Sequence, residues 1–357
     1  MKMSLKSDNK YLKTLGKISP ILILLVVIIL LHLFGVLSWN RDQAAIEVGL
    51  INSLVVLALF LSYTMLNICD LSTDGCYTLG VAVGGVMAAS GHPYLAIPAA
   101  LLAGALSGLV TAVLQTKMGV NSLLSGIIVN TGLYSVNIVI MGKSTINIFR
   151  NETVFSIVRR LFGEKARMGF ENAFERMPKS PLVQYSALIV AGAFVIIVIT
   201  FLSFFLRTKL GLAIHATGDN PEMVRSSSIN PVMTIITGLC ISGSMTALSG
   251  CLFIQYTNSA DINVGGGMVT MALASLLIGG VFISEGSIAV RCLGAVLGTI
   301  IFRLIYAIAL ALKIDTNLLK LVYSLIVVIA ISTPYFKKQL PMIKRRLKHR
   351  NGGEVRG

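Results

Sequence analysis

The chain has 357 residues, of which 55% are hydrophobic and only 13% are charged. A soluble domain carries about 25% charged residues, so this sequence cannot cover a water-exposed surface, and most of it is expected to lie in lipid. The net charge of +15 does not indicate binding to nucleic acid. Much of that charge lies in the end segments 1–17 and 337–357, each beside a long apolar run, and the middle of the chain lacks a basic surface interleaved with aromatic residues.

Apolar runs recur along the chain, and each is long enough to cross a hydrocarbon core about 30 Å thick as a helix. We expect about ten transmembrane helices, near residues 18–38, 46–68, 75–91, 94–116, 122–141, 182–206, 232–254, 268–284, 289–311 and 317–336. The first run is too long for the apolar region of a signal peptide and is interpreted as an uncleaved anchor. The sequence therefore predicts an all-α polytopic membrane protein with a single transmembrane domain.

The distribution of Lys and Arg predicts the orientation of these spans. If the N-terminal tail 1–17 is cytoplasmic, ten crossings return the basic tail 337–357 to the cytoplasm and place segment 207–231 there as well. Segment 142–181 then becomes an extracytoplasmic loop, although it is itself basic. Either this loop is an exception to the positive-inside rule, or the span count before it is off by one.

The two halves of the chain look related. Residues 46–141 and 232–336 each hold four expected spans, and each half contains a Gly-rich, interrupted span. Paired interrupted helices in two halves point to a transport path at the interface of the repeats. Small residues spaced four apart, such as Gly80 and Gly84, also predict closely packed helices.

The residues that usually carry metal or catalytic chemistry show no organised pattern. The five cysteines and four histidines lack the spacing of a metal site or a disulfide framework, so we expect no metal and no catalytic residue. Residues 142–145 read Gly-Lys-Ser-Thr, like the end of a phosphate-binding loop, but Asn137 stands where that motif needs glycine. The chain is therefore expected to be no enzyme and to hold no cofactor, with ATP bound by a partner subunit.

Segment 207–230 contains the clearest local signal for a helix. Asn220 can cap a helix, Pro221 suits its first position, and Glu222 favours the positive end of its dipole. These residues predict a short helix parallel to the membrane. On this evidence alone, the segment could equally be an ordinary connecting loop with a well-capped helix.

The same segment resembles the coupling loop of ABC importer permeases in the branched-chain amino acid and ribose permease superfamily. The family pattern is Gly-Leu-Ala-Ile-Arg-Ala-x-Gly-x-Asn-Pro, and residues 211–221 match it except for His215, which replaces the usual Arg. Ser228 replaces a usual Gly further on. The segments DLSTDGCYTLG, LLSGIIVNTGLYSVNIVIMGKSTI and ALSGCLFIQYTNSADINVGGGMVTMALASLLIGG resemble the tryptophan/tyrosine-type branch of these permeases.

The resemblance implies a set of partners and a mechanism. Permeases of this family form dimers, so we expect a homodimer in the bacterial plasma membrane, embedded in lipid. Two ATP-binding cassette subunits would dock on the cytoplasmic loops, and an extracytoplasmic substrate-binding protein would deliver the solute. The residues expected to couple to the ATPase are Gly211, Gly218, Asp219, Asn220, Pro221, Glu222 and Arg225.

Polar and ionisable residues within spans are candidates for the substrate path. The expected set is Asp70, Ser72, Asp74, Gly75, Asn130, Tyr134, Arg303 and Lys320. Arg303 and Lys320 would attract a substrate carboxylate, or Lys320 extends toward the interface and Arg303 binds backbone carbonyls or a neighbouring helix. Asp70 and Asp74 either line the path at membrane depth or cap helices at the cytoplasmic face. A dimer would place the path on its axis or within each subunit.

The function expected from these observations is the permease subunit of an ATP-driven importer for a small solute, an amino acid that is aromatic or branched-chain. A sugar or nucleoside is the alternative substrate. A secondary transporter driven by an ion gradient would account for the spans and the repeats but not for the capped cytoplasmic loop. An intramembrane enzyme would need paired catalytic groups at membrane depth, for which the sequence offers only weak support.

Overall fold

The computed structural model describes residues 39–161, 184–283 and 286–311, with single residues at 321, 324, 325 and 328. The expected span 18–38, the tails 1–17 and 337–357, and Lys320 lie outside the described residues, as does most of the expected span 317–336. The described elements are α2 (Trp39–Leu59), the π-helix η1 (Phe60–Met65), α3 (Thr73–Ala89), α4 (Pro93–Thr116), α5 (Ser122–Met141), β1 (Thr145–Asn147), α6 (Val154–Leu161), α8 (Ser186–Phe205), α9 (Lys209–Asp219), α10 (Pro221–Ser226), α11 (Pro231–Thr257), β2 (Ser259–Asp261), α12 (Met268–Phe282) and α13 (Ile288–Ala311).

Six of the described helices are long and apolar enough to cross a membrane: α2 with η1, α4, α5, α8, α11 and α13. The chain is thus a mostly helical, polytopic membrane protein. The expected spans 75–91 and 268–284 correspond to α3, with 17 residues, and α12, with 15. At 1.5 Å per residue these helices are roughly 26 and 22 Å long, which is less than the core thickness of about 30 Å. The total of ten spans stays a prediction.

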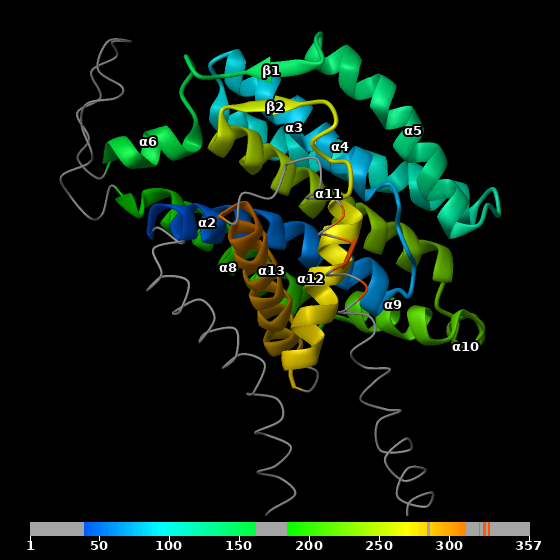
Figure 1. Cartoon of the computed structure of the whole chain (residues 1–357). Helices are drawn as coiled ribbons and strands as arrows, with labels where there is room; N and C mark the ends of the chain where they lie inside the picture. Colours follow the sequence, from blue (N-terminus) through cyan, green and yellow to red (C-terminus); the bar gives the residue numbers. More distant parts are fainter. Residues whose placement is uncertain are drawn as a thin grey trace, which may run out of the picture.

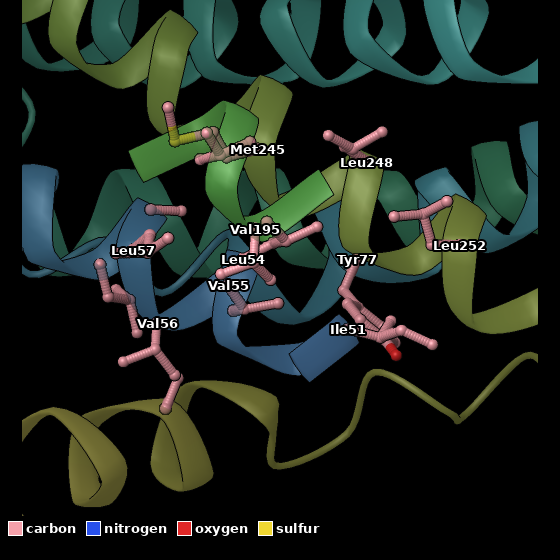
Figure 2. Close-up of a cluster of buried hydrophobic side chains, with 14 of the residues drawn as sticks. Ile51, Leu54, Val55, Val56, Leu57, Tyr77, Val195, Met245, Leu248 and Leu252 are labelled. Carbon is pink, nitrogen blue, oxygen red and sulfur yellow. The ribbon is translucent and has the colours of Figure 1, made fainter. Parts of the chain in front are cut away.

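Helices α2 and α11 form the centre of the bundle, and most residues of both are buried. Figure 1 shows α2 running through the middle, with α12 and α13 crossing it. Figure 2 shows Ile51 and Leu54 of α2 beside Tyr77 of α3, Val195 of α8 and Leu248 of α11. Side chains of α2 thus meet several other helices, which explains why residues 51–59 of α2 are buried on every face.

Close approach between α3 and α11 depends on small residues. A Cβ at Gly80 would collide with the carbonyl oxygen of Ala247, and a Cβ at Gly84 would lie 2.8 Å from the Cα of Cys251. Without a hydrophobic force between helices in lipid, such backbone contact is what holds them together. The four-residue spacing of Gly80 and Gly84 therefore forms the seam on which α3 packs against α11.

The two ends of α11 define two ends of the molecule. Its first residue follows α10, and its last precedes β2, which pairs antiparallel with β1 in the register Thr145↔Asp261 and Asn147↔Ser259. We call the part around α9 and α10 the loop end, and the part around β1, β2 and α6 the sheet end (Figure 1). The all-α expectation missed this sheet, because three-residue strands are too short to show an alternating pattern.

The described part of segment 142–181 also differs from a plain loop, since it contains β1 and α6. The structure also differs from the expectation of interruptions within the Gly-rich spans. Helix α3 continues through Gly80 and Gly84, and the non-helical backbone lies before it, at 66–72, and before α12, at 262–267. Each of the two short helices thus begins after a non-helical segment. The pseudo-repeat between the halves stays a prediction.

Candidate functional site

The loop end contains two short helices. Helix α9 begins after Thr208, whose Oγ1 accepts a hydrogen bond from the backbone N–H of Gly211 at 3.3 Å. Helix α10 begins after Asn220, whose Oδ1 accepts from the backbone N–H groups of Glu222 and Met223, both at 3.1 Å. The cap predicted at Asn220 is therefore present, and α9 is an additional helix that the sequence did not predict.

Helix α9 packs against the bundle through one face, which contains Gly211, Thr217 and Gly218. A Cβ at Gly211 would collide with the backbone of Leu206, and one at Gly218 would collide with the carbonyl oxygen of Met65 at the end of η1. The hydroxyl groups of Thr217 and Thr234 lie 2.8 Å apart and join α9 to α11. Since neither glycine has room for a side chain, the backbone of α9 packs directly against its neighbours at both positions.

The remaining residues expected to couple to an ATPase face away from the bundle. They are exposed, and they comprise Asp219, Asn220, Pro221, Glu222 and Arg225. Met223 is 53% exposed, so α10 presents an apolar side chain between charged ones. Arg225 pairs with Glu222 at 3.4 Å, and His215 with Asp219 at 3.3 Å. The loop end thus forms a small amphipathic projection. Gly211 and Gly218 lie on the opposite side of α9, where they pack against the bundle.

Helix α2 ends in the π-helix η1, and π-helical turns are frequent at functional sites. Asn67 follows with φ = 55°, a left-handed conformation rare for residues other than glycine. Asp70 Oδ1 then accepts hydrogen bonds from the backbone N–H of Ser72 at 2.9 Å and from its hydroxyl at 2.6 Å. Asp70 and Ser72, both expected in the substrate path, therefore form a local turn that starts α3.

Asp74 makes a long-range contact. Its carboxylate accepts hydrogen bonds from the backbone N–H groups of Gly267 at 3.0 Å and of Val269 at 2.8 Å. These groups begin α12, so Asp74 of α3 caps the neighbouring short helix from outside. Asp74 thus makes a capping contact, to the helix that corresponds to the expected span 268–284, and its place in the substrate path stays a prediction.

Gly75 and Asn130, two further path candidates, lie together where α3 meets α5. A Cβ at Gly75 would lie 2.7 Å from Oδ1 of Asn130. Asn137 of α5 also donates from Nδ2 to the carbonyl oxygen of Gly75 at 3.1 Å. Tyr134 lies on the outer side of α5 and is 49% exposed.

Arg303 belongs to a separate polar cluster between α13, α2 and α3. With the amide of Asn52 oriented toward it, the Asn52 oxygen accepts from Nε of Arg303 at 3.1 Å and from Nη2, and the Asn52 nitrogen donates to the Tyr77 hydroxyl at 3.3 Å. Arg303 therefore binds a neighbouring helix. Asn52 and Tyr77 were not among the residues expected from the sequence, although an Asn within an apolar span is itself a signal. Among the described residues, no group of three or more His, Cys, Asp or Glu is placed to hold a metal.

These features define a polytopic helical membrane protein with a rigid two-helix projection at one end. The family described as "Branched-chain amino acid transport system / permease component" matches residues 43–331. The chain therefore belongs to this family of ABC transport permeases, which are transport components rather than enzymes.

Three relatives show the range of the similarity. The chain is 32% identical to the tyrosine transport system permease protein of Clostridioides difficile over 80% of this chain and 88% of that one. It is 22% identical to the fructose import permease protein FruF of Bifidobacterium longum over 87% and 83%. It is 28% identical to the autoinducer 2 import system permease protein LsrD of Yersinia enterocolitica over 60% and 58%. No solved structure matches the chain.

Proposed function

We propose that this chain is the membrane-spanning subunit of an ATP-driven importer for an amino acid, with an aromatic amino acid such as tyrosine as the first candidate. The observation that carries the proposal is α10, an exposed helix capped by Asn220 and supported by the tightly seated α9. The similarity to a tyrosine permease supports the substrate. The similarity to fructose and autoinducer 2 permeases favours a sugar as the second candidate.

The proposed mechanism transmits force from the loop end into the bundle. An ATPase subunit would hold α10, and its movement would reach Met65 and Leu66 through the backbone contact at Gly218. Those residues end η1 and lead to the turn at Asp70, which starts α3. Since Asp74 of α3 caps α12, a shift of α3 would also move α12. The two short helices would thus change position while the long helices keep their packing.

The proposed assembly is a homodimer in the bacterial inner membrane, with both termini in the cytoplasm. The ATP-binding subunits would lie at the loop end, and the substrate-binding protein at the sheet end. Exposure of Tyr134 on α5 supports a dimer, because a tyrosine hydroxyl in the middle of a span needs a polar partner that lipid tails do not offer. That face of α5 would line the substrate path or meet the second copy, with Gly75 and Asn130 behind it.

A test of the coupling proposal uses the permease reconstituted in nanodiscs with its ATPase and binding protein. Replacing Met223 by Asp should abolish ATPase stimulation by the loaded binding protein, because a charge would enter the apolar contact of α10. Met118→Asp is the matched control, since Met118 is 67% exposed near the same end but lies outside α9 and α10. Full stimulation in the Met223→Asp variant would refute the assigned role of α10.

The substrate is tested separately by uptake into proteoliposomes. We expect labelled tyrosine to accumulate in an ATP-dependent manner and unlabelled fructose not to compete. Competition by fructose but not by amino acids would replace the first candidate by the second.

A further inference from the structure

A polar cavity of about 440 Å³ lies at the sheet end between α2, α6, α8 and α11. Its size falls in the range of small-molecule sites, about 300 to 1,000 Å³. Gln43 and Glu47 line it from α2, Phe155 and Arg159 from α6, and Tyr256 from α11. None of the residues expected in the substrate path lines this cavity.

Glu47 is the central feature of the cavity. Glu47 is only 5% exposed. Its carboxylate accepts hydrogen bonds from the Tyr256 hydroxyl at 2.8 Å and from the Gln43 side-chain amide at 2.9 Å. Both donors are neutral. Within the described ranges, Glu47 takes part in no salt bridge, whereas Glu152 nearby pairs with Arg160. A buried carboxylate without a cation is costly, so a ligand that brings a positive charge would be favoured here.

The rest of the lining complements an amino acid. Arg159 and Arg160 line the cavity from α6 and bring basic groups to it, with Arg160 also paired with Glu152. Phe155 and Tyr256 form an edge-to-face pair with ring centroids 5.7 Å apart, which provides an aromatic wall. One small cavity therefore combines an acidic group, basic groups and an aromatic surface, as recognition of a zwitterion with an aromatic side chain requires.

We propose that this cavity is a binding site for a free α-amino acid, in which Glu47 receives the ammonium group, the arginines of α6 attract the carboxylate, and the Phe155–Tyr256 pair contacts the side chain. The inference rests on the proposed function, and it deepens that function by naming a binding site and the residue that recognises the ammonium group of the substrate. The site would hold substrate at the sheet end before the bundle opens. A sugar could donate hydroxyl hydrogen bonds to Glu47 but brings no cation to it, so we expect the cavity to favour an amino acid over a sugar.

The first experiment measures binding of labelled tyrosine to the full-length permease in nanodiscs, without ATPase or binding protein, by equilibrium dialysis. The sequence has a single tryptophan, Trp39, and its fluorescence gives a second readout. Tyrosine should bind saturably. Its analogue without the amino group, 3-(4-hydroxyphenyl)propionate, should bind at least tenfold more weakly, and fructose should not bind. Equal binding of tyrosine and this analogue, or no binding of tyrosine, would overturn the inference.

The second experiment uses variants. Glu47→Gln preserves the size of the side chain and removes its charge, and it should weaken tyrosine binding at least tenfold. Asp261→Asn is the matched control, because it makes the same change at the sheet end outside the cavity. A hydrogen bond from the backbone N–H of Asn263 lowers the pKa of Asp261, so this control also removes a charge at neutral pH. Unchanged binding in Glu47→Gln would count against the site.

Uptake separates this inference from the proposed function. If tyrosine uptake by the complete importer is normal in Glu47→Gln, the cavity is not the substrate site and the importer function stands. If the wild-type importer takes up fructose and no amino acid, the proposed substrate itself is wrong. Should Glu47→Gln fail to fold, the comparison of tyrosine with its des-amino analogue on the unmodified protein still decides the matter.

Discussion

Replacing Asp74 by Ala should destabilise the protein by loosening α12 from α3. Two hydrogen bonds are lost, from the N–H groups of Gly267 and Val269. The loss of a helix cap costs about 1 kcal/mol, and polar contacts between membrane helices contribute about 0.6 kcal/mol on average, with a maximum near 1.7 kcal/mol. With two bonds to one charged acceptor, we expect a loss of about 2 kcal/mol in the free energy of unfolding. Asp74→Asn keeps one acceptor oxygen and should lose about 1 kcal/mol.

The assay is equilibrium unfolding in mixed micelles followed by circular dichroism, together with hydrogen exchange at the amides of residues 267 and 269. Exchange at these two amides should increase in Asp74→Ala before exchange in α11 does, because the lost contacts are local to α12. Asp219→Ala is the control, since Asp219 is exposed at the end of α9, and it should stay within about 0.5 kcal/mol of the wild type. Wild-type stability with unchanged protection in Asp74→Ala would show that the cap contributes nothing.

Three further predictions test other contacts. Gly80→Leu should prevent folding, because the new Cβ would meet the backbone of α11. Gly132→Leu is the control and should be tolerated, because a Cβ there would meet open space. The two variants are compared by the yield of monodisperse protein in size-exclusion chromatography. Asn220→Ala should destabilise α10 by about 1 kcal/mol and lower ATPase stimulation without changing global unfolding. An unchanged rate of stimulated ATP hydrolysis would count against a role of the cap in coupling. Arg303→Lys should lose the two-point contact with Asn52 and with it about 1–2 kcal/mol in the free energy of unfolding. Thermal unfolding would detect this loss, and equal stability would mean that the contact does not stabilise the protein.

The sequence predicted well what depends on local chemistry. Apolar runs long enough for the bilayer appear as helices α4, α5, α8, α11 and α13. The helix α10 begins where Asn220 and Pro221 predict it, because a cap needs only a side chain and the N–H groups two and three residues later. The family resemblance, read from a contiguous stretch of the same loop, is confirmed by the match over residues 43–331.

The sequence did not predict where the backbone leaves the helical conformation. The expected span 46–68 reads as one apolar helix, yet it passes into η1 and then into the left-handed Asn67. Backbone of this kind is tolerated at membrane depth only where neighbouring elements surround it. Here Gly218 of α9 and Gly238 of α11 lie against Met65 and Leu66, so elements far along the chain surround the break.

Composition and periodicity by themselves determined that this chain crosses the bilayer many times, because lipid acts on each segment independently of the others. The partners of individual polar groups were decided only by the tertiary structure. Asp74 reaches α12, which begins almost 200 residues later, and Glu47 becomes buried only when α11 brings Tyr256 against α2. A carboxylate at the edge of an apolar run has the same local sequence whether it faces water or closes a cavity, and only the packing of the helices tells these cases apart.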